Sequence, residues 1–414
     1  MEDRRNFLRK ASLAMIPGII PFAPVMSNLV INRNQGFERD KVPGIQPEQK
    51  SQRRSVYQPE LSPVNFVADK ELMSAGDYIS RLDLINKQSA IQADSYGNGG
   101  SVEALEKKFA AITGKQKAIY MPTGTMANQL AIAALCGANT KVFVQETSHV
   151  YRDEADAAQS VHNKRLIPLA KGEAAFTLGE LRAAIDYHND GEVFKSGIGA
   201  VSIENPVRRA NGAQVPFDEI KKISSWCHEN KIKLHLDGAR LFLASAYSKI
   251  PVRDYCNQFD TVYISLYKYF GAAGGAILCG DAELIGKMEH QIKIFGGTMY
   301  QAWPQAAMAL HYLDGFEKRF QSAVIKSNEL FAQVNNLAEL KIIPWPNGSN
   351  IYQMKFTNDI STKKFSDTMQ AKYRITISGF LMDGIGRLAV NESILLRDNE
   401  ELLKAIKESL LAAK

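Results

Sequence analysis

The sequence is poor in cysteine and has no dense block of lysine and arginine in its body. Only four cysteines occur in 414 residues, with no CxxC pair and no histidine-rich region beside them. They indicate neither a zinc site nor a disulfide framework, and we expect no bound metal. The net charge is +6, and without basic blocks it indicates no nucleic-acid surface. No internal repeat or low-complexity segment stands out.

The N-terminal stretch lacks an unbroken apolar run of the length that a membrane span requires. Residues 1–30 contain the pair Arg4-Arg5, then Phe7-Leu8, then a weak apolar run interrupted by prolines. This order resembles a Tat export signal; the alternative is an amphipathic arm with a chance arginine pair. No small-x-small cleavage site is evident, so retention as a membrane tether stays open. We expect export by the Tat machinery to the periplasm, with the polar residues 31–60 as a flexible linker.

The remaining composition is that of a globular protein large enough for two domains. It is 45% hydrophobic and 23% charged, which permits a sizeable core. Helical and strand-like segments alternate over residues 61–315, the pattern of an α/β domain with a mostly parallel sheet. In residues 316–414 a long helix, short strands and a final helix at 399–413 predict a small C-terminal α/β domain.

A single lysine, Lys268, interrupts two apolar strand-like stretches. β-branched and aromatic residues precede it, a loop of small residues follows, and a second apolar strand is expected at 276–279. A buried ammonium group tends to lose its proton, which is what a Schiff-base lysine needs. The alternative is a lysine at a strand end whose amine reaches solvent.

Three further groups follow predicted strands, each with an ordinary alternative. Thr123-Gly124-Thr125 turns a strand into a helix, whose first N–H groups favour an anion; a simple helix cap would have the same sequence. His149 follows a strand at the edge where open α/β sheets bind ligands, although a lone loop histidine is usually only solvated. Asp237 follows another strand. Together with Lys268 these residues supply the amine, carboxylate, phosphate cradle and stacking ring that pyridoxal phosphate requires.

The order of these motifs resembles the threonine aldolase branch of the β-eliminating lyases, which are fold-type I pyridoxal-phosphate enzymes. The resemblance extends from about Phe66 to the C-terminus. It implies the fold-type I architecture, with a large domain around a mostly parallel sheet and a small C-terminal α/β domain. The matching motifs are Asp94-Ser95-Tyr96-Gly97, residues 123–130, His149, Glu204-Asn205, residues 235–242, Lys268 and residues 296–302.

The resemblance also implies a role for each residue of the cofactor site. Lys268 matches the Schiff-base lysine, Asp237 the partner of the pyridine nitrogen, and His149 the imidazole stacked on the ring. Gly124 and Thr125, with Thr123 before them, match the phosphate-binding turn.

The same resemblance implies a substrate site and an oligomer. Arg240 and Arg387 match the pair that holds the substrate carboxylate, the bidentate role that suits arginine, and Tyr96 falls at the substrate site. Lys293 matches a lysine that reaches the phosphate from a neighbouring subunit. We therefore expect a homodimer or homotetramer with sites at the subunit interface, acting on a small amino acid.

Several positions depart from the family pattern. Val207 stands where a second active-site histidine is expected, and Ala68 where a substrate-placing serine is expected. The base for the β-hydroxyl could then be His149, a bound water, or one of Tyr267 and Tyr269 beside the lysine. These aromatics make a bulky aryl substrate plausible.

The implied activity is cleavage of a β-hydroxy-α-amino acid to glycine and an aldehyde. One alternative is β-elimination, or another reaction at the Cα proton, with Lys268 as the base and with ammonia and a keto acid as products of the elimination. The other is a non-catalytic exported binding module on the same fold.

Overall fold

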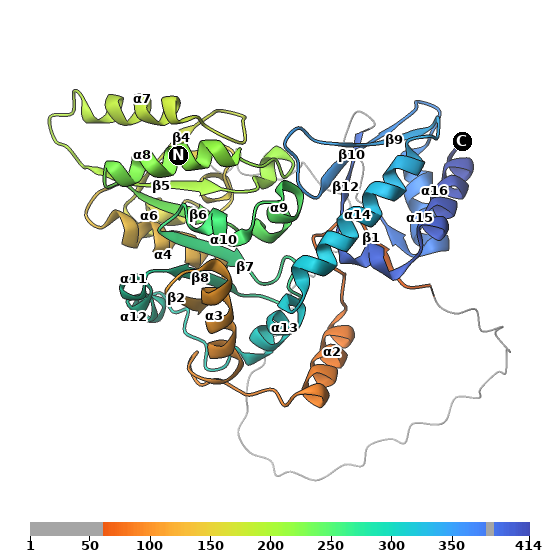
Figure 1. The fold of residues 1–414 in the computed structure, drawn as a ribbon, viewed down its shortest axis with the longest axis horizontal. Helices are drawn as coiled ribbons and strands as arrows, with labels where there is room; N and C mark the ends of the chain where they lie inside the picture. The colour runs from red at the N-terminus through yellow and green to blue at the C-terminus, as the bar shows by residue number, and fades with distance from the viewer. Residues whose placement is uncertain (1–60, 378–384) are drawn as a thin grey trace, which may run out of the picture. The chain divides into compact units, whose positions relative to one another are not determined.

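The computed structural model describes residues 61–377 and 385–414 (Figure 1). The predicted export signal and linker, residues 1–60, lie outside this part of the chain. None of the helices in the described part has both the length and the apolar character that crossing a membrane requires.

A seven-stranded sheet forms the centre of the larger part of the fold. Only β8 runs antiparallel to its neighbours, so the predicted mostly parallel sheet is confirmed. In spatial order the strands are β2 (Lys117–Met121), β8 (Ala276–Gly280), β7 (Thr261–Ser265), β6 (Lys233–Asp237), β5 (Ile198–Glu204), β3 (Lys141–Gln145) and β4 (Arg165–Leu169).

Alternate residues of these strands face a large hydrophobic cluster on one side of the sheet and two smaller clusters on the other, so the sheet is covered on both sides. On β7, Val262 and Ile264 face the large cluster, whereas Tyr263 faces a smaller one. The smaller side carries α4 (Gly124–Cys136), α6 (Ala157–His162), α11 (Ala282–Gly286) and α12 (Met288–Ile294). The larger side carries α3 (Gly100–Thr113), α7 (Leu178–Asn189), α8 (Phe217–Glu229), α9 (Leu241–Ser248), α10 (Val252–Cys256) and α13 (Trp303–Leu313).

A second, antiparallel sheet forms after the long helix α14 (Phe316–Val334), which begins directly after Gly315 in the left-handed conformation. Figure 1 shows it beside α14 and the last two long helices. The order is β12-β10-β9, and a further pair, β1 (Val64–Asn65) with β11, joins the start of the body to its C-terminal part. The elements are β9 (Leu340–Pro344), β10 (Ile351–Phe356), α15 (Thr362–Tyr373), β11 (Ile375–Thr376), β12 (Ile385–Ala389), η2 (Glu392–Leu396) and α16 (Asn399–Ala413).

Three further short or peripheral helices complete the described part of the chain. They are α2 (Ala75–Gln88), α5 (His149–Arg152) and η1 (Arg208–Ala210). Parallel strands end at one common edge of a sheet, and ligands gather there in open α/β folds. The residues predicted to hold a cofactor follow β2, β3, β6 and β7 at that edge.

Candidate active site

Lys268 lies in a loop that is fixed at its base to two strand ends. The Leu266 N–H donates to the Gly275 carbonyl, and the Gly275 N–H donates to the Pro122 carbonyl at the end of β2, both at 3.1 Å. The side chain is half-buried, with Nζ 5.9 Å from the centre of the Tyr267 ring. Within the described chain, Nζ makes no hydrogen bond or ion pair. Burial, and then the charge of Arg240, lower the pKa of Lys268 to about 8, so the amine is available as a nucleophile.

This pKa predicts how the protein takes up pyridoxal phosphate. Only the neutral amine attacks an aldehyde, and its fraction rises about tenfold per pH unit below the pKa. We expect covalent attachment of the cofactor to accelerate from pH 6 to about 8 and then to level off, followed by stopped-flow visible absorbance. An amine with an ordinary pKa would instead continue to accelerate toward pH 10.5.

Asp237 and His149 belong to one buried hydrogen-bond network. The Asn128 amide donates to Asp237 Oδ2 at 2.9 Å and to Glu154 Oε1 at 2.7 Å. The same Glu154 oxygen lies 2.8 Å from His149 Nδ1. The His149 backbone N–H donates to Glu204 Oε2 at 2.7 Å. The structure thus brings Asp237 and His149 together as predicted, through two residues, Asn128 and Glu154, to which the sequence had assigned no role.

Charges in this network shift one another's protonation. The hydrogen bond to Glu154 raises the pKa of His149, and burial raises the pKa of Glu154. Burial and the nearby Asp237 raise the pKa of Glu204 to about 7. Ligand atoms of His149, Glu154 and Asp237 lie within 4.8 Å of one another, a spacing that a cation could bridge. The Asn128 amide nitrogen, however, already donates to both carboxylates.

The turn at the start of α4 is built as an anion site. Thr123 is the N-cap, and its side chain accepts from the Met126 N–H at 3.1 Å, leaving the first N–H groups of a 13-residue helix directed outward. Gly124 has no room for a side chain, because a Cβ would lie 2.0 Å from the Tyr263 hydroxyl oxygen. Ser265, on the same face of β7, has a buried hydroxyl without a hydrogen-bond partner among the described residues. Period-two alternation from Tyr263 to Ser265 was the sequence signal that could have identified both.

Arg240 is held in place by an ion pair with Asp69. Its Nε donates to Asp69 Oδ2 at 2.7 Å, and both side chains are largely buried. The other oxygen of Asp69 accepts from the Asn350 amide at 3.1 Å. The terminal nitrogens of the guanidinium are thereby left for a carboxylate. Arg387 is exposed on β12, opposite Gln353, so the described contacts place Arg240 near Lys268 but do not place Arg387 there.

Removing this support should weaken substrate binding more than turnover. In Asp69→Ala the guanidinium loses its charged partner, and hydrogen bonds to charged groups contribute about 1.5–3 kcal/mol. We expect KM for the amino acid to rise about tenfold or more with a smaller fall in kcat. Asp367→Ala, which breaks the exposed ion pair with Lys363 within α15, is the control. A fall in kcat at unchanged KM would contradict the assignment.

Tyr96 and Lys293 form a separate, exposed group. Lys293 Nζ lies 5.7 Å from the centre of the Tyr96 ring, and Tyr96 packs edge-on against Tyr300 at 5.3 Å. Within the described chain, no hydrogen bond connects this group to Lys268. The structure therefore does not bring Tyr96 and Lys293 together with the predicted cofactor residues of the same subunit.

The two tyrosines beside Lys268 differ completely in their surroundings. Tyr267 is 42% exposed, whereas Tyr269 is 1% exposed and packs among Phe242, Phe270 and Phe316. Burial raises the pKa of Tyr269 far above its usual value. The alternative in which Tyr269 acts as the base is therefore wrong, because its ring and its hydroxyl are buried, whereas Tyr267 stays among the alternatives.

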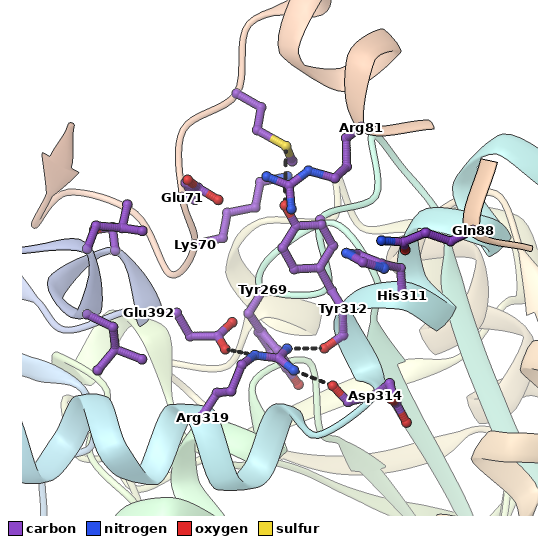
Figure 2. Close-up of a pocket in the computed structure, with 15 residues that line it drawn as sticks. Lys70, Glu71, Arg81, Gln88, Tyr269, His311, Tyr312, Asp314, Arg319 and Glu392 are labelled. Carbon is purple, nitrogen blue, oxygen red and sulfur yellow. Dashed lines mark hydrogen bonds and ion pairs between the residues drawn. The ribbon is translucent and has the colours of Figure 1, made fainter. Parts of the chain in front are cut away.

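A cavity of about 660 Å³ lies between the segment leading into α2 and the start of α14 (Figure 2). Tyr269 and Gly271 line it, but none of the predicted cofactor residues does. Arg319 donates there to Glu392 at 2.7 Å and to the Tyr312 carbonyl at 2.6 Å. Two of the charged groups that line this cavity, Arg319 and Glu392, are thus paired with each other.

Comparison with known proteins assigns the chain to a family. A family model described as beta-eliminating lyase matches residues 86–352. The chain belongs to the beta-eliminating lyase family. Enzymes of this family depend on pyridoxal phosphate.

Individual members of the beta-eliminating lyase family differ in the activity named for them. The low-specificity L-threonine aldolase of Candida albicans is 35% identical over 212 residues, 51% of this chain and 56% of that protein. The alanine racemase TOXG of Cochliobolus carbonum is 33% identical over 240 residues, 57% of this chain and 59% of that protein. The chain therefore spans little more than half the length of these relatives.

A solved structure covers more of the family fold. It comes from Exiguobacterium sp. 255-15 and is assigned as an aromatic amino acid beta-eliminating lyase/threonine aldolase. It superimposes with a TM-score of 0.72 at 25% identity, covering 85% of this chain and 98% of that one. The predicted fold-type I architecture is thus confirmed.

The residues present fit the family's cofactor. The N-terminus of α4 and the Ser265 hydroxyl, which has no hydrogen-bond partner among the described residues, suit a phosphate. Residue 124 is glycine, and the Tyr263 hydroxyl occupies the place where a Cβ would lie. Asp237 offers a buried carboxylate for a protonated ring nitrogen, and Lys268 offers the amine.

Proposed function

We propose that the protein is a pyridoxal-phosphate-dependent lyase that cleaves a β-hydroxy-α-amino acid to glycine and an aldehyde. The observation that carries the proposal is the convergence of three groups at one sheet edge. These are Lys268 with its lowered pKa, the Asp237–His149 network, and Arg240 fixed by Asp69. The name of the Candida relative supports the substrate class.

Each group has a task in such a reaction. When bound, pyridoxal phosphate supplies an electron sink that stabilises negative charge at the substrate Cα. Asp237 holds the positive charge on the ring nitrogen. Arg240 binds the substrate carboxylate, and the direction in which it holds the carboxylate decides which bond at Cα is aligned to break.

His149 is the residue best placed to accept the proton of the β-hydroxyl. Its Nδ1 is bound to Glu154, and its side chain remains 29% exposed, so Nε2 can face a substrate. Val207 is fully buried and pairs with Ala213 as backbone, which gives it no part in proton transfer. When a carboxylate binds one ring nitrogen of a histidine, it fixes the orientation of the other nitrogen, which can then accept a proton from the substrate.

The test is product identification. Holoenzyme is incubated separately with L-threonine, L-allo-threonine and a phenyl-substituted β-hydroxy amino acid, and glycine and aldehyde are quantified. We expect glycine in stoichiometric amounts with aldehyde from at least one of them. Its absence from all three, with the cofactor shown to be bound, would refute the proposal.

A second candidate is chemistry at the Cα proton, with Lys268 as the base. The racemase name of the Cochliobolus relative favours it. Racemisation of alanine, or release of ammonia and a keto acid from a β-substituted amino acid, would distinguish it from cleavage in the same assays.

We further propose that the active protein is an oligomer. Exposed apolar side chains surround Lys293 and Tyr96, an unusual surface for a monomer. They are Ile294, Phe295, Met299 and Tyr300. Light scattering of the purified protein should give a mass of two or four chains, and a monomeric active enzyme would exclude a shared site.

We also propose export through the Tat machinery. The proposal rests on the Arg4-Arg5 pair and the short apolar run after it. Replacing both arginines by lysine should retain the protein in the cytoplasmic fraction. An unchanged distribution would mean that this stretch is not a signal.

A further inference from the structure

Asn128 occupies the centre of the buried network, and its amide makes three hydrogen bonds. The residue lies in the second turn of α4 and is fully buried. Its Oδ1 lies 2.9 Å from His235 Nε2, while its Nδ2 donates to both Asp237 and Glu154. An amide nitrogen has two hydrogens, and here each one is used by a different carboxylate.

Only one orientation of this amide satisfies all its neighbours. In the reverse orientation Oδ1 would face two carboxylate oxygens and remove one donor from each of them, which is costly for buried groups. The observed orientation requires His235 to donate from Nε2. His235 Nδ1 lies 2.8 Å from the Thr261 hydroxyl, which can donate to it. Complete burial lowers the pKa of His235 to about 4, so the ring is neutral and this tautomer is consistent.

We propose that Asn128, oriented by His235, is a positioning residue that holds the carboxylates of Asp237 and Glu154 in fixed positions relative to each other. Through Glu154 it also fixes the orientation of the His149 ring and its affinity for a proton. The proposal rests on the proposed function to the extent that Asp237 and His149 act on cofactor and substrate. It adds a link between the two sides of the site: the acid for the ring nitrogen and the imidazole are supported by the same amide.

The charges around His149 determine how its proton affinity changes when the contact with Glu154 is altered. Glu154, Asp237 and Asp153 are acidic groups near the imidazole, Lys268 is basic, and Glu204 binds the backbone N–H of His149. Glu154 is the one in direct hydrogen-bond contact with the ring. Glu154→Gln keeps the shape but removes the charge, so the proton affinity of His149 should fall.

Nuclear magnetic resonance of holoenzyme labelled with ¹⁵N-histidine tests the orientation directly. The chain has seven histidines, and His235→Gln and His149→Asn identify two of them. We expect His235 to be neutral and protonated at Nε2 from pH 5.5 to 9, and His149 to carry a proton at Nδ1. A His235 ring protonated at Nδ1 would reverse the amide and overturn the proposal.

Cofactor affinity and the titration of His149 test the positioning role. Asn128→Ala and His235→Leu should each weaken pyridoxal-phosphate binding about tenfold, since supporting residues around a bound group contribute on this order. His235→Gln keeps a donor for Asn128 and should stay within about twofold of wild type, which a purely structural role would not predict. Glu154→Gln should shift the His149 titration to lower pH.

Glu392→Gln is the matched control, because it removes another buried carboxylate of raised pKa that pairs with Arg319 in the cavity of Figure 2. It should leave cofactor affinity and His149 unchanged. Wild-type cofactor affinity in Asn128→Ala together with an unshifted His149 in Glu154→Gln would overturn the proposal. If Asn128→Ala does not fold, the Glu154→Gln titration and the His235 tautomer decide.

These measurements do not depend on any substrate. A holoenzyme with the expected His235 tautomer that forms no glycine refutes only the proposed function. Glycine formation with a reversed His235 refutes only the positioning role.

Discussion

Lys268→Ala should abolish measurable lyase activity, with a loss of at least about 10³-fold. The lysine would serve both as the covalent attachment point and as a proton donor or acceptor, and a positioned acid–base group alone contributes about 10²–10⁴-fold. The visible absorbance of attached cofactor should disappear as well. The phosphate turn at the start of α4 is untouched by this change, so pyridoxal phosphate should still bind noncovalently, as measured by equilibrium dialysis.

Lys115→Ala is the matched control for this variant. Lys115 is another lysine whose pKa is lowered by burial, and it donates to the Phe259 carbonyl away from the site. We expect its variant to keep the visible absorbance and most of the activity. Retained absorbance in Lys268→Ala would mean that a different amine binds the cofactor.

Gly124→Ala should have the second largest effect, by closing the phosphate turn. The added methyl group would lie 2.0 Å from the Tyr263 hydroxyl oxygen and 2.4 Å from its ring carbon Cζ. Tyr263 is 3% exposed on a central strand, so its ring has no space to move away. Forcing extra volume into a packed site costs about 1–3 kcal/mol, so we expect cofactor affinity to fall about 5- to 150-fold.

Gly179→Ala tests whether any added methyl group on a helix has this effect. Gly179 lies in the first turn of α7, where a Cβ would meet only the Thr177 side chain at 3.7 Å. Its variant should bind pyridoxal phosphate as wild type does. If Gly124→Ala binds equally well, the turn is not the phosphate site.

The sequence predicted those parts of the fold that depend on local patterns. The final helix was expected at 399–413 and is observed at Asn399–Ala413, because its apolar periodicity and its acidic first turn agree. Residues at strand ends were also predictable: Asp237 and Lys268 converge because parallel strands end at one edge. Thr123-Gly124-Thr125 was expected to lead from a strand into a helix, and helix α4 begins within this turn, at Gly124, because Thr123 serves as its cap.

Contacts between segments distant in the chain could not be predicted. Asp69 supports Arg240 from 171 residues away, and Asn128 reaches Asp237 across 109 residues. Neither pairing has a periodic or spacing signal in one sequence. The alternative of Tyr269 as the base was wrong for the opposite reason. Its position beside Lys268 in the sequence suggested that it lies at the site, but the loop turns its ring into the core. Sequence adjacency does not reveal that reversal.

The hydrogen bond from Asn350 to Asp69 has a consequence for the order in which the parts of the site become complete during synthesis. All the groups that fit the cofactor lie between residues 123 and 268, whereas the support of Arg240 is complete only when Asn350 has joined Asp69. A nascent chain that has emerged only through the large sheet therefore contains the proposed cofactor groups before the support of Arg240 is complete. Under the proposed function, the cofactor groups are thus synthesised before the residues that complete the support of Arg240.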